Sequence, residues 1–267
     1  MNVRTLRLAA ASATAVITAT VALTACGPKA GDTGQFAQDK QLLTTCPKDK
    51  KVGAKVDVDV SGSGRSAQLG ADRTNVVETV ARRTAVCGGH LRVSAFSVTT
   101  AATVILYDHE ISLSGATDNA RLRHVQTAVD DVLQKVKDAY PASLKALSPN
   151  GSDILGQYRL AAEYLGQLKS GYRLELVIVS DGYQAGQNIS LGGKVLSQAE
   201  ANAIAARITV PSLPGSSVTV AGIGKVATGK PADSAIVDGV VRFWNAVCHR
   251  SKAEQCSSVT DYTTTGR

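Results

Sequence analysis

The stretch from Lys51 to Ser66, KVGAKVDVDVSGSGRS, constrains the fold of this chain more than any other. Its first ten residues carry valine at positions 52, 56, 58 and 60, which is the two-residue period of a β-strand. The Gly/Ser cluster that follows favours a tight turn opening a helix. Asp59, Ser61 and Ser63 lie at this turn and bring three oxygen atoms towards one point, which suits a hard cation such as Mg²⁺.

The first 25 residues are typical of an export signal, because two arginines precede an Ala/Val/Thr-rich apolar run without acidic residues. We therefore exclude residues 1–25 from the fold. The segment ends in Leu23-Thr24-Ala25-Cys26, which resembles the lipobox of bacterial lipoproteins. This resemblance implies that Cys26 becomes the multiply acylated first residue, which anchors the protein to the extracytoplasmic face of a bacterial cell membrane. An ordinary secretory signal and a retained membrane helix are the alternatives.

The composition limits the classes of partner. Loss of Arg4 and Arg7 with the signal lowers the formal net charge from +7 to +5, which is only modestly basic. Aromatic residues make up 4%, and no basic run is interleaved with them, which argues against a nucleic-acid partner.

The cysteines beyond Cys26 are even in number and lack the spacing of a zinc site, so we expect them to form disulfides in an exported chain. They are Cys46, Cys87, Cys248 and Cys256.

The rest of the chain divides into three parts. Residues 26–50 are polar and lack a sustained hydrophobic period, so we expect a flexible tether, and we expect the tail 251–267 to be loose. In 51–250, strand-like runs alternate with amphipathic stretches, which predicts one α/β domain: a doubly wound, mostly parallel sheet flanked by helices on both faces. Further strands are predicted at 91–98, 103–107, 174–179 and 217–223. Helices are predicted at 66–87, from Asp118 to Pro141, from Ser152 or Asp153 to about Gly171, from the Ser197/Glu200 capping box to Ile208, and at 233–248.

Three motifs should meet at one edge, because ligands of such sheets bind at the carboxyl ends of the strands. Asp59, Ser61 and Ser63 end the first strand, Ser152 begins a helix, and Asp181 follows another strand. In this order and context, the motifs DVSGS, GSDI and VIVSDG resemble the metal-ion-dependent adhesion site of the von Willebrand factor A domain.

The resemblance covers about residues 51–250. It implies that the three serine hydroxyls bind Mg²⁺, with Mn²⁺ or Ca²⁺ as alternatives, and that the two aspartates bind directly or through water. An acidic side chain of a protein partner would complete the coordination, so the chain would be a binding module and not an enzyme. Ser152 stands where the family usually has threonine; serine keeps the ligand oxygen but loses the methyl group that limits its rotamers.

Asp57 supports a different interpretation. A carboxylate in a strand buried on both faces needs a partner, and the sequence does not identify one. Asp57-Val-Asp59-Val-Ser61 also resembles the DxDx(T/V) loop of haloacid-dehalogenase-type phosphatases, which implies a metal-dependent phosphatase with Asp57 and Asp59 in the chemistry. We prefer the binding module, because the further acidic pair of that family is missing after Ser180-Asp181-Gly182. A third alternative is that the Ser/Gly cluster only forms the turn.

The topology also favours one disulfide pairing. The first strand runs towards the metal edge and its helix runs back, so Cys46 and Cys87 both lie at the opposite edge. Cys248, at the end of another returning helix, and Cys256 lie there too. We therefore favour the pairs 46–87 and 248–256. The tether joins at this same edge, so the metal edge would face away from the membrane.

Overall fold

The computed structural model describes residues 30–62, 65–67, 69–186, 189–191, 193–226 and 232–264. The predicted signal peptide, Cys26 and Ser63 lie outside these residues. Within the described ranges, no helix is both long enough and apolar enough to cross a lipid bilayer.

The valine-rich segment forms the central strand of a six-stranded sheet with the order β3-β2-β1-β4-β7-β8. Every residue of this strand after Lys51 is buried, as a strand with neighbours on both sides and helices on both faces requires. All neighbouring strands are parallel except β2 and β3. The six strands are β1 (Lys51–Asp59), β2 (Gly89–Phe96), β3 (Val104–Ile111), β4 (Tyr172–Val179), β7 (Ser217–Ala221) and β8 (Gln255–Val259). A separate hairpin pairs β5 (Ala185–Gly186) with β6 (Ile189–Ser190).

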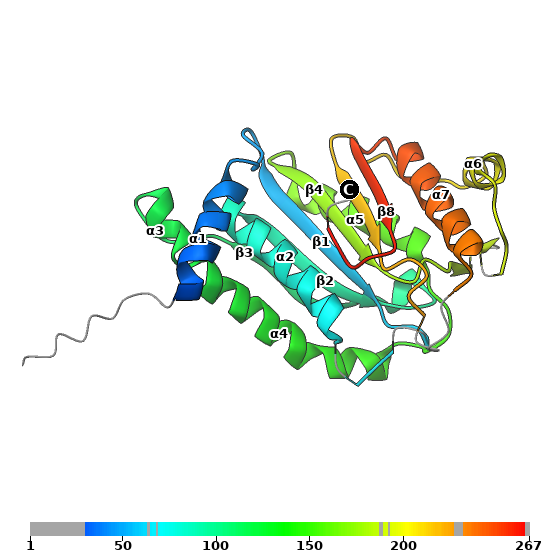
Figure 1. Ribbon diagram of the computed structural model, residues 1–267, viewed down its shortest axis with the longest axis horizontal. Coiled ribbons are helices and arrows are strands. Elements are labelled where there is room, and N and C mark those ends of the chain that lie inside the picture. The colour runs from blue at the N-terminus through cyan, green and yellow to red at the C-terminus, as the bar shows by residue number, and fades with distance from the viewer. Residues whose placement is uncertain are drawn as a thin grey trace, which may run out of the picture.

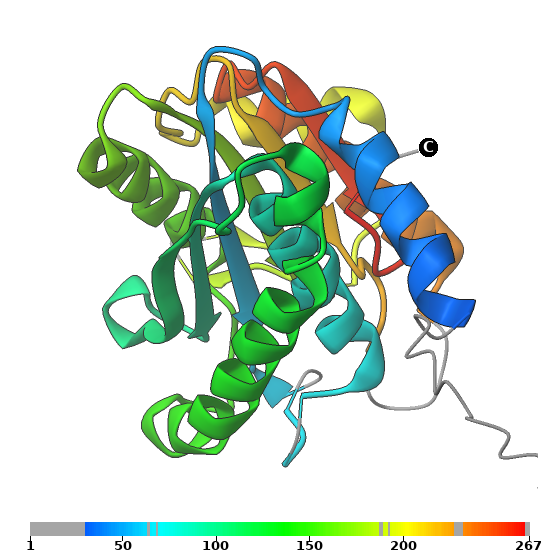
Figure 2. The same cartoon turned by 90° about the vertical axis from the view of Figure 1, so that its left-hand side faces the viewer.

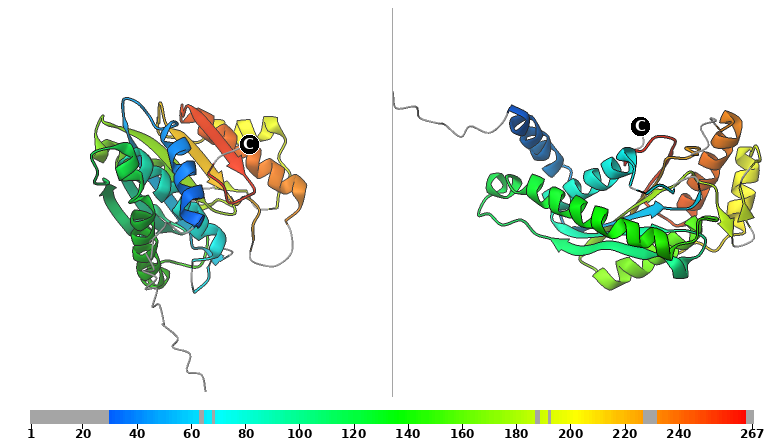
Figure 3. Two further views of the ribbon diagram at one scale, coloured as in Figure 1. Left: turned by 60° about the vertical axis from the view of Figure 1, so that its left-hand side comes forward. Right: turned by 90° about the horizontal axis from the view of Figure 1, so that it is seen from below.

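Helices cover both faces of the sheet (Figures 1 and 3). On one face, α2 and α4 pack their valine stripes against β1, β2 and β3. On the other face, α5, α6 and α7 enclose a second core that includes the fully buried Trp244. This arrangement confirms the predicted fold class. The helices are α1 (Ala30–Leu43), α2 (Ala71–Cys87), the 3₁₀ turn η2 (Thr100–Ala102), α3 (Asp118–Leu122), α4 (Val125–Ala146), α5 (Ile154–Leu168), α6 (Gln198–Ala206) and α7 (Ser234–Arg250).

The expectation of a flexible tether over 26–50 is wrong for much of its length, because α1 packs beside α2 (Figure 2). Asp39 is almost completely buried and pairs with Arg82 of α2 at 3.2 Å. Phe36 and Leu42 pack against the core, and the disulfide at Cys46 follows directly. These few contacts hold a helix whose sequence has almost no hydrophobic period.

Two further expectations differ from the structure. Pro141 lies inside α4 and does not end it, and the helix continues to Ala146. The guanidinium of Arg65 donates hydrogen bonds to the carbonyls of Leu144 and Leu147, which satisfies the last carbonyl groups of this extended helix. The tail is also more ordered than expected, because Gln255 to Val259 form β8 beside β7.

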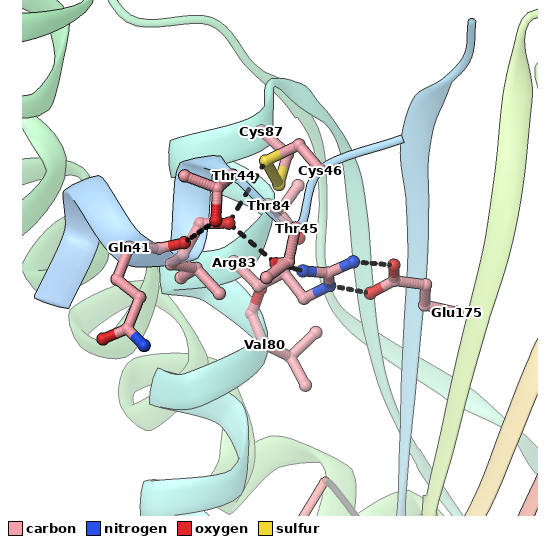
Figure 4. The surroundings of a disulfide bond; sticks show 10 residues. Gln41, Thr44, Thr45, Cys46, Val80, Arg83, Thr84, Cys87 and Glu175 are labelled. Atoms are coloured by element: carbon pink, nitrogen blue, oxygen red, sulfur yellow. Dashed lines mark hydrogen bonds and ion pairs between the residues drawn. A yellow bond between two sulfur atoms is a disulfide. The ribbon is translucent and has the colours of Figure 1, made fainter. Parts of the chain in front are cut away.

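Both predicted disulfides are present. Cys46 pairs with Cys87 across 41 residues of sequence, and Cys248 pairs with Cys256 across 8. The first disulfide joins the end of α1 to the end of α2 (Figure 4). The Ser197/Glu200 capping box is confirmed as well, at the start of α6.

Candidate metal site

The candidate residues lie at the topological switch point of the sheet. The chain passes from β1 to β2 and β3 on one side, then crosses to β4, β7 and β8 on the other. The carboxyl ends of β1 and β4 therefore lie side by side with their connections running in opposite directions, which opens a crevice for ligands in α/β sheets. Asp59 is the last residue of β1, and Asp181 follows the end of β4 by two residues.

Asp59 is buried, and both of its carboxylate oxygens accept hydrogen bonds. Oδ1 accepts from the backbone N–H of Ser61 at 2.9 Å, which tightens the turn after β1. Oδ2 accepts from the hydroxyl of Ser180 at 2.7 Å, from the end of the adjacent strand β4. These bonds fix the carboxylate in one orientation at the strand edge.

The hydroxyls of Ser61 and Ser152 meet although 91 residues separate them, with a distance of 2.8 Å between the two Oγ atoms. Ser152 is positioned by its neighbours: its carbonyl accepts from the N–H of Ala185 at 3.0 Å, and the next N–H, of Asp153, donates to Ser97 at 2.8 Å. Asp153 is the N-cap of α5 and accepts from Gly156, so its side chain serves the helix.

Asp181 is buried and lies in a turn fixed at several points. Its Oδ1 accepts from the N–H of Tyr183 at 3.0 Å, and its carbonyl accepts from the N–H of Gly224 at 2.9 Å. Trp244 of α7 donates its indole N–H to the carbonyl of Gly182 at 2.9 Å. Gly182 has φ +82°, a conformation in which a side chain would be strained. The structure thus places four predicted residues at one edge: Asp59, Ser61, Ser152 and Asp181.

Two residues near this site were not predicted from the sequence. Ser180 joins the ends of β1 and β4 through its bond to Asp59, and its only signal was its place beside Asp181 in the VIVSDG motif. Arg73, in the first turn of α2, donates to the carbonyl oxygen of Asp59 at 2.8 Å. No feature of the sequence around Arg73 indicated this contact.

The donor set fits Mg²⁺ better than a softer metal. Ligands 2.0–2.1 Å from Mg²⁺ on adjacent corners of an octahedron are about 2.9 Å apart, close to the separation of the two serine hydroxyls. The donors are hydroxyl and carboxylate oxygens, which hard cations prefer. No group of three or more His, Cys, Asp or Glu side chains in the described part of the chain is arranged to hold a metal ion. A site here therefore depends on the hydroxyls.

Asp57 has its partner two residues earlier in the same strand. The ammonium group of Lys55 donates to both carboxylate oxygens of Asp57, and the two side chains are 2% and 0% exposed. Residues two apart in a strand point to the same face, which brings the two groups together. Burial lowers the pKa of Lys55 and raises the pKa of Asp57, because removal from water disfavours both charges. This carboxylate belongs to the sheet interior.

Comparisons with protein-family models and with curated proteins found no match. Similar solved structures include an aerotolerance-related membrane protein from Bacteroides fragilis (15% identity, TM-score 0.38), over 79% of this chain and 92% of that one. A von Willebrand factor type A structure from Catenulispora acidiphila is 12% identical with a TM-score of 0.40, over 80% and 39% of the two chains. The pilus adhesin SpaC from Lactobacillus rhamnosus GG is 11% identical with a TM-score of 0.41, over 82% and 29%. The match thus spans less than half of the last two proteins, and the proposals below rest on the residues of this chain.

Proposed function

We propose that this chain is a lipid-anchored, extracytoplasmic binding module that engages a protein partner through a Mg²⁺-dependent adhesion site. The observation that carries the proposal is the contact between the hydroxyls of Ser61 and Ser152 at the switch point of the sheet, beside two buried aspartates. The proposed metal residues are Asp59, Ser61, Ser63, Ser152 and Asp181.

The residues of the site divide into two roles. Ser61 and Ser152 present neutral oxygens, and Ser63 would add a third. The carboxylate of Asp59 is held by Ser180 and by the backbone of Ser61, so it supplies negative charge at a fixed place. A Mg²⁺ ion bound largely by neutral oxygens would keep enough positive charge to attract a carboxylate of the partner. The site would thus recognise an acidic side chain.

The phosphatase alternative is less well supported. A nucleophilic aspartate must reach the phosphorus atom of its substrate. Asp57 is fully buried in the central strand and ion-paired with Lys55. The one sequence feature that favoured the phosphatase therefore has a structural explanation, and we propose a binding role for the site rather than an enzymatic one.

The proposed location rests on the sequence and on the disulfides. Two disulfides in a small domain are typical of an oxidising, extracytoplasmic compartment. Both lie towards the edge at which β1 begins, opposite the candidate metal site. A membrane anchor at Cys26 would therefore leave the metal edge facing away from the bilayer.

Mg²⁺ is expected to stabilise the wild-type chain against urea. At a concentration one hundred times its dissociation constant, the free energy of unfolding should rise by about 2.7 kcal/mol over that measured with EDTA. Ser61→Ala and Ser152→Ala each remove a proposed ligand and should lose most of this increase.

The matched control is Ser114→Ala, which alters an exposed serine in a loop away from the site and should respond to Mg²⁺ as the wild type does. Wild-type stability that is indifferent to millimolar Mg²⁺, Mn²⁺ and Ca²⁺ would rule out the metal site. Hydrolysis of p-nitrophenyl phosphate that Asp57→Asn abolishes, in a variant that circular dichroism shows to be folded, would instead support the phosphatase.

Lipidation makes a separate prediction. Mass spectrometry of the protein purified from membranes should show a mature chain that begins at Cys26 and carries acyl chains. Cys26→Ala should release the protein from the membrane fraction. An unmodified amino terminus at another residue would contradict the anchor without bearing on the metal site.

A further inference from the structure

The two edge strands of the sheet differ in how well they are protected against pairing with a further strand. An edge strand exposes unpaired backbone groups, and natural proteins discourage pairing there with charges, prolines or bulges. The β3 edge carries Asp108, His109 and Glu110, and its register with β2 shifts between Val93 and Ser94. The β8 edge reads QCSSV, has no charge or proline, and keeps a regular register with β7 from Gln255 to Val259. By these criteria β8 is open to a further strand.

The hydrogen bonds to β7 show which backbone groups of β8 face outwards. Gln255 donates its N–H to the carbonyl of Ser216 at 3.3 Å, and the carbonyl of Val259 accepts from the N–H of Gly222 at 3.1 Å. Backbone groups of a strand alternate in direction with a period of two. Residues 255, 257 and 259 therefore bond to β7, and Cys256 and Ser258 direct their N–H and C=O groups away from it. Ser258 as a whole is 8% exposed, because its side chain lies on the same face as that of Cys256, which is bonded to Cys248 of α7.

A groove of about 1250 Å³ lies along this edge and extends over the sheet face of β4, β7 and β8 towards α1 and α2. Each charged side chain that lines it has an ion-pair partner. Arg83 forms two hydrogen bonds with Glu175, at 2.6 and 2.7 Å (Figure 4), and Arg173 pairs with Glu254 at 3.3 Å. Arg82 pairs with both Asp39 and Glu78. The remaining lining mixes uncharged polar with apolar residues. The polar ones include Asn75, Thr79, Thr219, Asn245, Gln255 and Ser257, and the apolar ones include Leu42, Val80, Val177 and Val259.

This lining selects among possible occupants. An amphipathic helix would bury its apolar face on the sheet, but there the valines Val177 and Val259 lie among arginine, glutamate, serine and threonine side chains that the helix would also have to cover. A strongly charged ligand would find its counter-charges already paired within the protein. An extended, uncharged polypeptide needs no counter-charge in the groove, and its backbone can form hydrogen bonds with the outward N–H and C=O groups of β8.

A second copy of this chain fits less well. Two copies related by a twofold axis would pair their β8 strands antiparallel, so their candidate metal sites would point in opposite directions. Two copies anchored to one membrane as proposed above would both have to point away from it.

We propose that the open edge of β8 binds an extended, uncharged strand of another protein, which adds a seventh strand to the six-stranded sheet. The backbone of that strand would pair with Cys256 and Ser258, and alternate side chains would lie in the groove beside Gln255 and Ser257. This docking surface is separate from the candidate metal site and does not depend on Mg²⁺.

The test uses a synthetic peptide with the sequence of residues 216–222, SSVTVAG, blocked at both ends. It is uncharged, and it is the sequence that already pairs with β8 from the other side. With the full chain in detergent and peptide at millimolar concentration, amide hydrogen exchange measured by NMR should slow about tenfold or more at Cys256 and Ser258. The amide of Ser257, already bonded to β7, should change little.

Ser258→Pro removes an outward N–H and should abolish the protection at Cys256, because an edge strand can carry proline where the N–H points away from the neighbouring strand. If that variant does not fold, Ser257→Lys serves in its place, since it puts a charge beside the edge and leaves the backbone intact. The matched control His109→Lys alters the other edge strand and should bind the peptide normally. A peptide carrying Thr219→Pro should not bind.

Two results would overturn the proposal. One is unchanged exchange at Cys256 and Ser258 at saturating peptide, or protection that persists in both β8 variants. The other is a wild-type dimer in light scattering that Ser258→Pro converts to a monomer, which would assign the edge to a second copy.

Discussion

Asp57→Ala is expected to lower the free energy of unfolding by about 3–5 kcal/mol, because it leaves the ammonium group of Lys55 buried without its counter-charge. Lys55→Met should cost a similar amount for the converse reason. The double variant Lys55→Met/Asp57→Leu removes both charges and should regain most of the loss. It should equal the wild type or exceed it by about 1–4 kcal/mol, since desolvation of two charges offsets much of their attraction.

Urea unfolding of the wild type, Lys55→Met, Asp57→Leu and the double variant gives the double-mutant cycle. Lys135→Met is the matched control, because it breaks a surface pair with Asp131 in which both side chains are about half exposed, and it should have little effect. If Asp57→Ala lowers the free energy of unfolding by as little as the control does, then Lys55 and Asp57 do not form a charged pair in the folded state.

The second large effect is expected from the longer disulfide. Replacing Cys46 and Cys87 by serine opens a loop of 41 residues, which in the chain-entropy description costs roughly 4 kcal/mol. Replacing Cys248 and Cys256 opens a loop of only 8 residues and should cost roughly 2.5 kcal/mol. The shorter disulfide thus provides the control for the longer one.

Urea unfolding of both pairs of variants measures this difference, and hydrogen exchange locates its origin. Loss of the Cys46–Cys87 disulfide should raise exchange in α1 above that in α2, because α1 then depends on the Asp39–Arg82 pair and a few apolar contacts. Equal destabilisation by the two pairs of substitutions would argue against loop closure as the main contribution.

The central elements of the fold could be predicted because their patterns are strong. The valines of β1 mark a strand buried on both faces, and the three- and four-residue spacing of Val125, Val129, Val132 and Val136 marks α4. Two of the segments that the sequence did not reveal, α1 and β8, lack such periods. Tertiary contacts hold them instead: a disulfide and one ion pair for α1, and the edge of β7 for β8.

The candidate site was only partly predictable for a similar reason. The predicted order of strands and helices along the chain is enough to place four residues at one edge of the sheet: Asp59, Ser61, Ser152 and Asp181. The contacts of Ser180 and Arg73 with Asp59 depend on how neighbouring elements pack, which no local pattern records. The partner of Asp57 could have been predicted from the sequence. Lys55 lies two positions away on the same strand, so its side chain must point to the same face as that of Asp57.

The Cys46–Cys87 disulfide also determines how the chain would carry mechanical load. Asp59 and Ser61 lie inside the loop that it closes. A pull between a partner at these residues and a membrane anchor at the amino terminus would be divided between two covalent paths. One runs down β1 to Cys46, and the other runs along α2 to Cys87 and across the disulfide. Since β1 would be pulled along its own axis between two hydrogen-bonded neighbours, its bonds would be loaded in shear together and not peeled apart one by one.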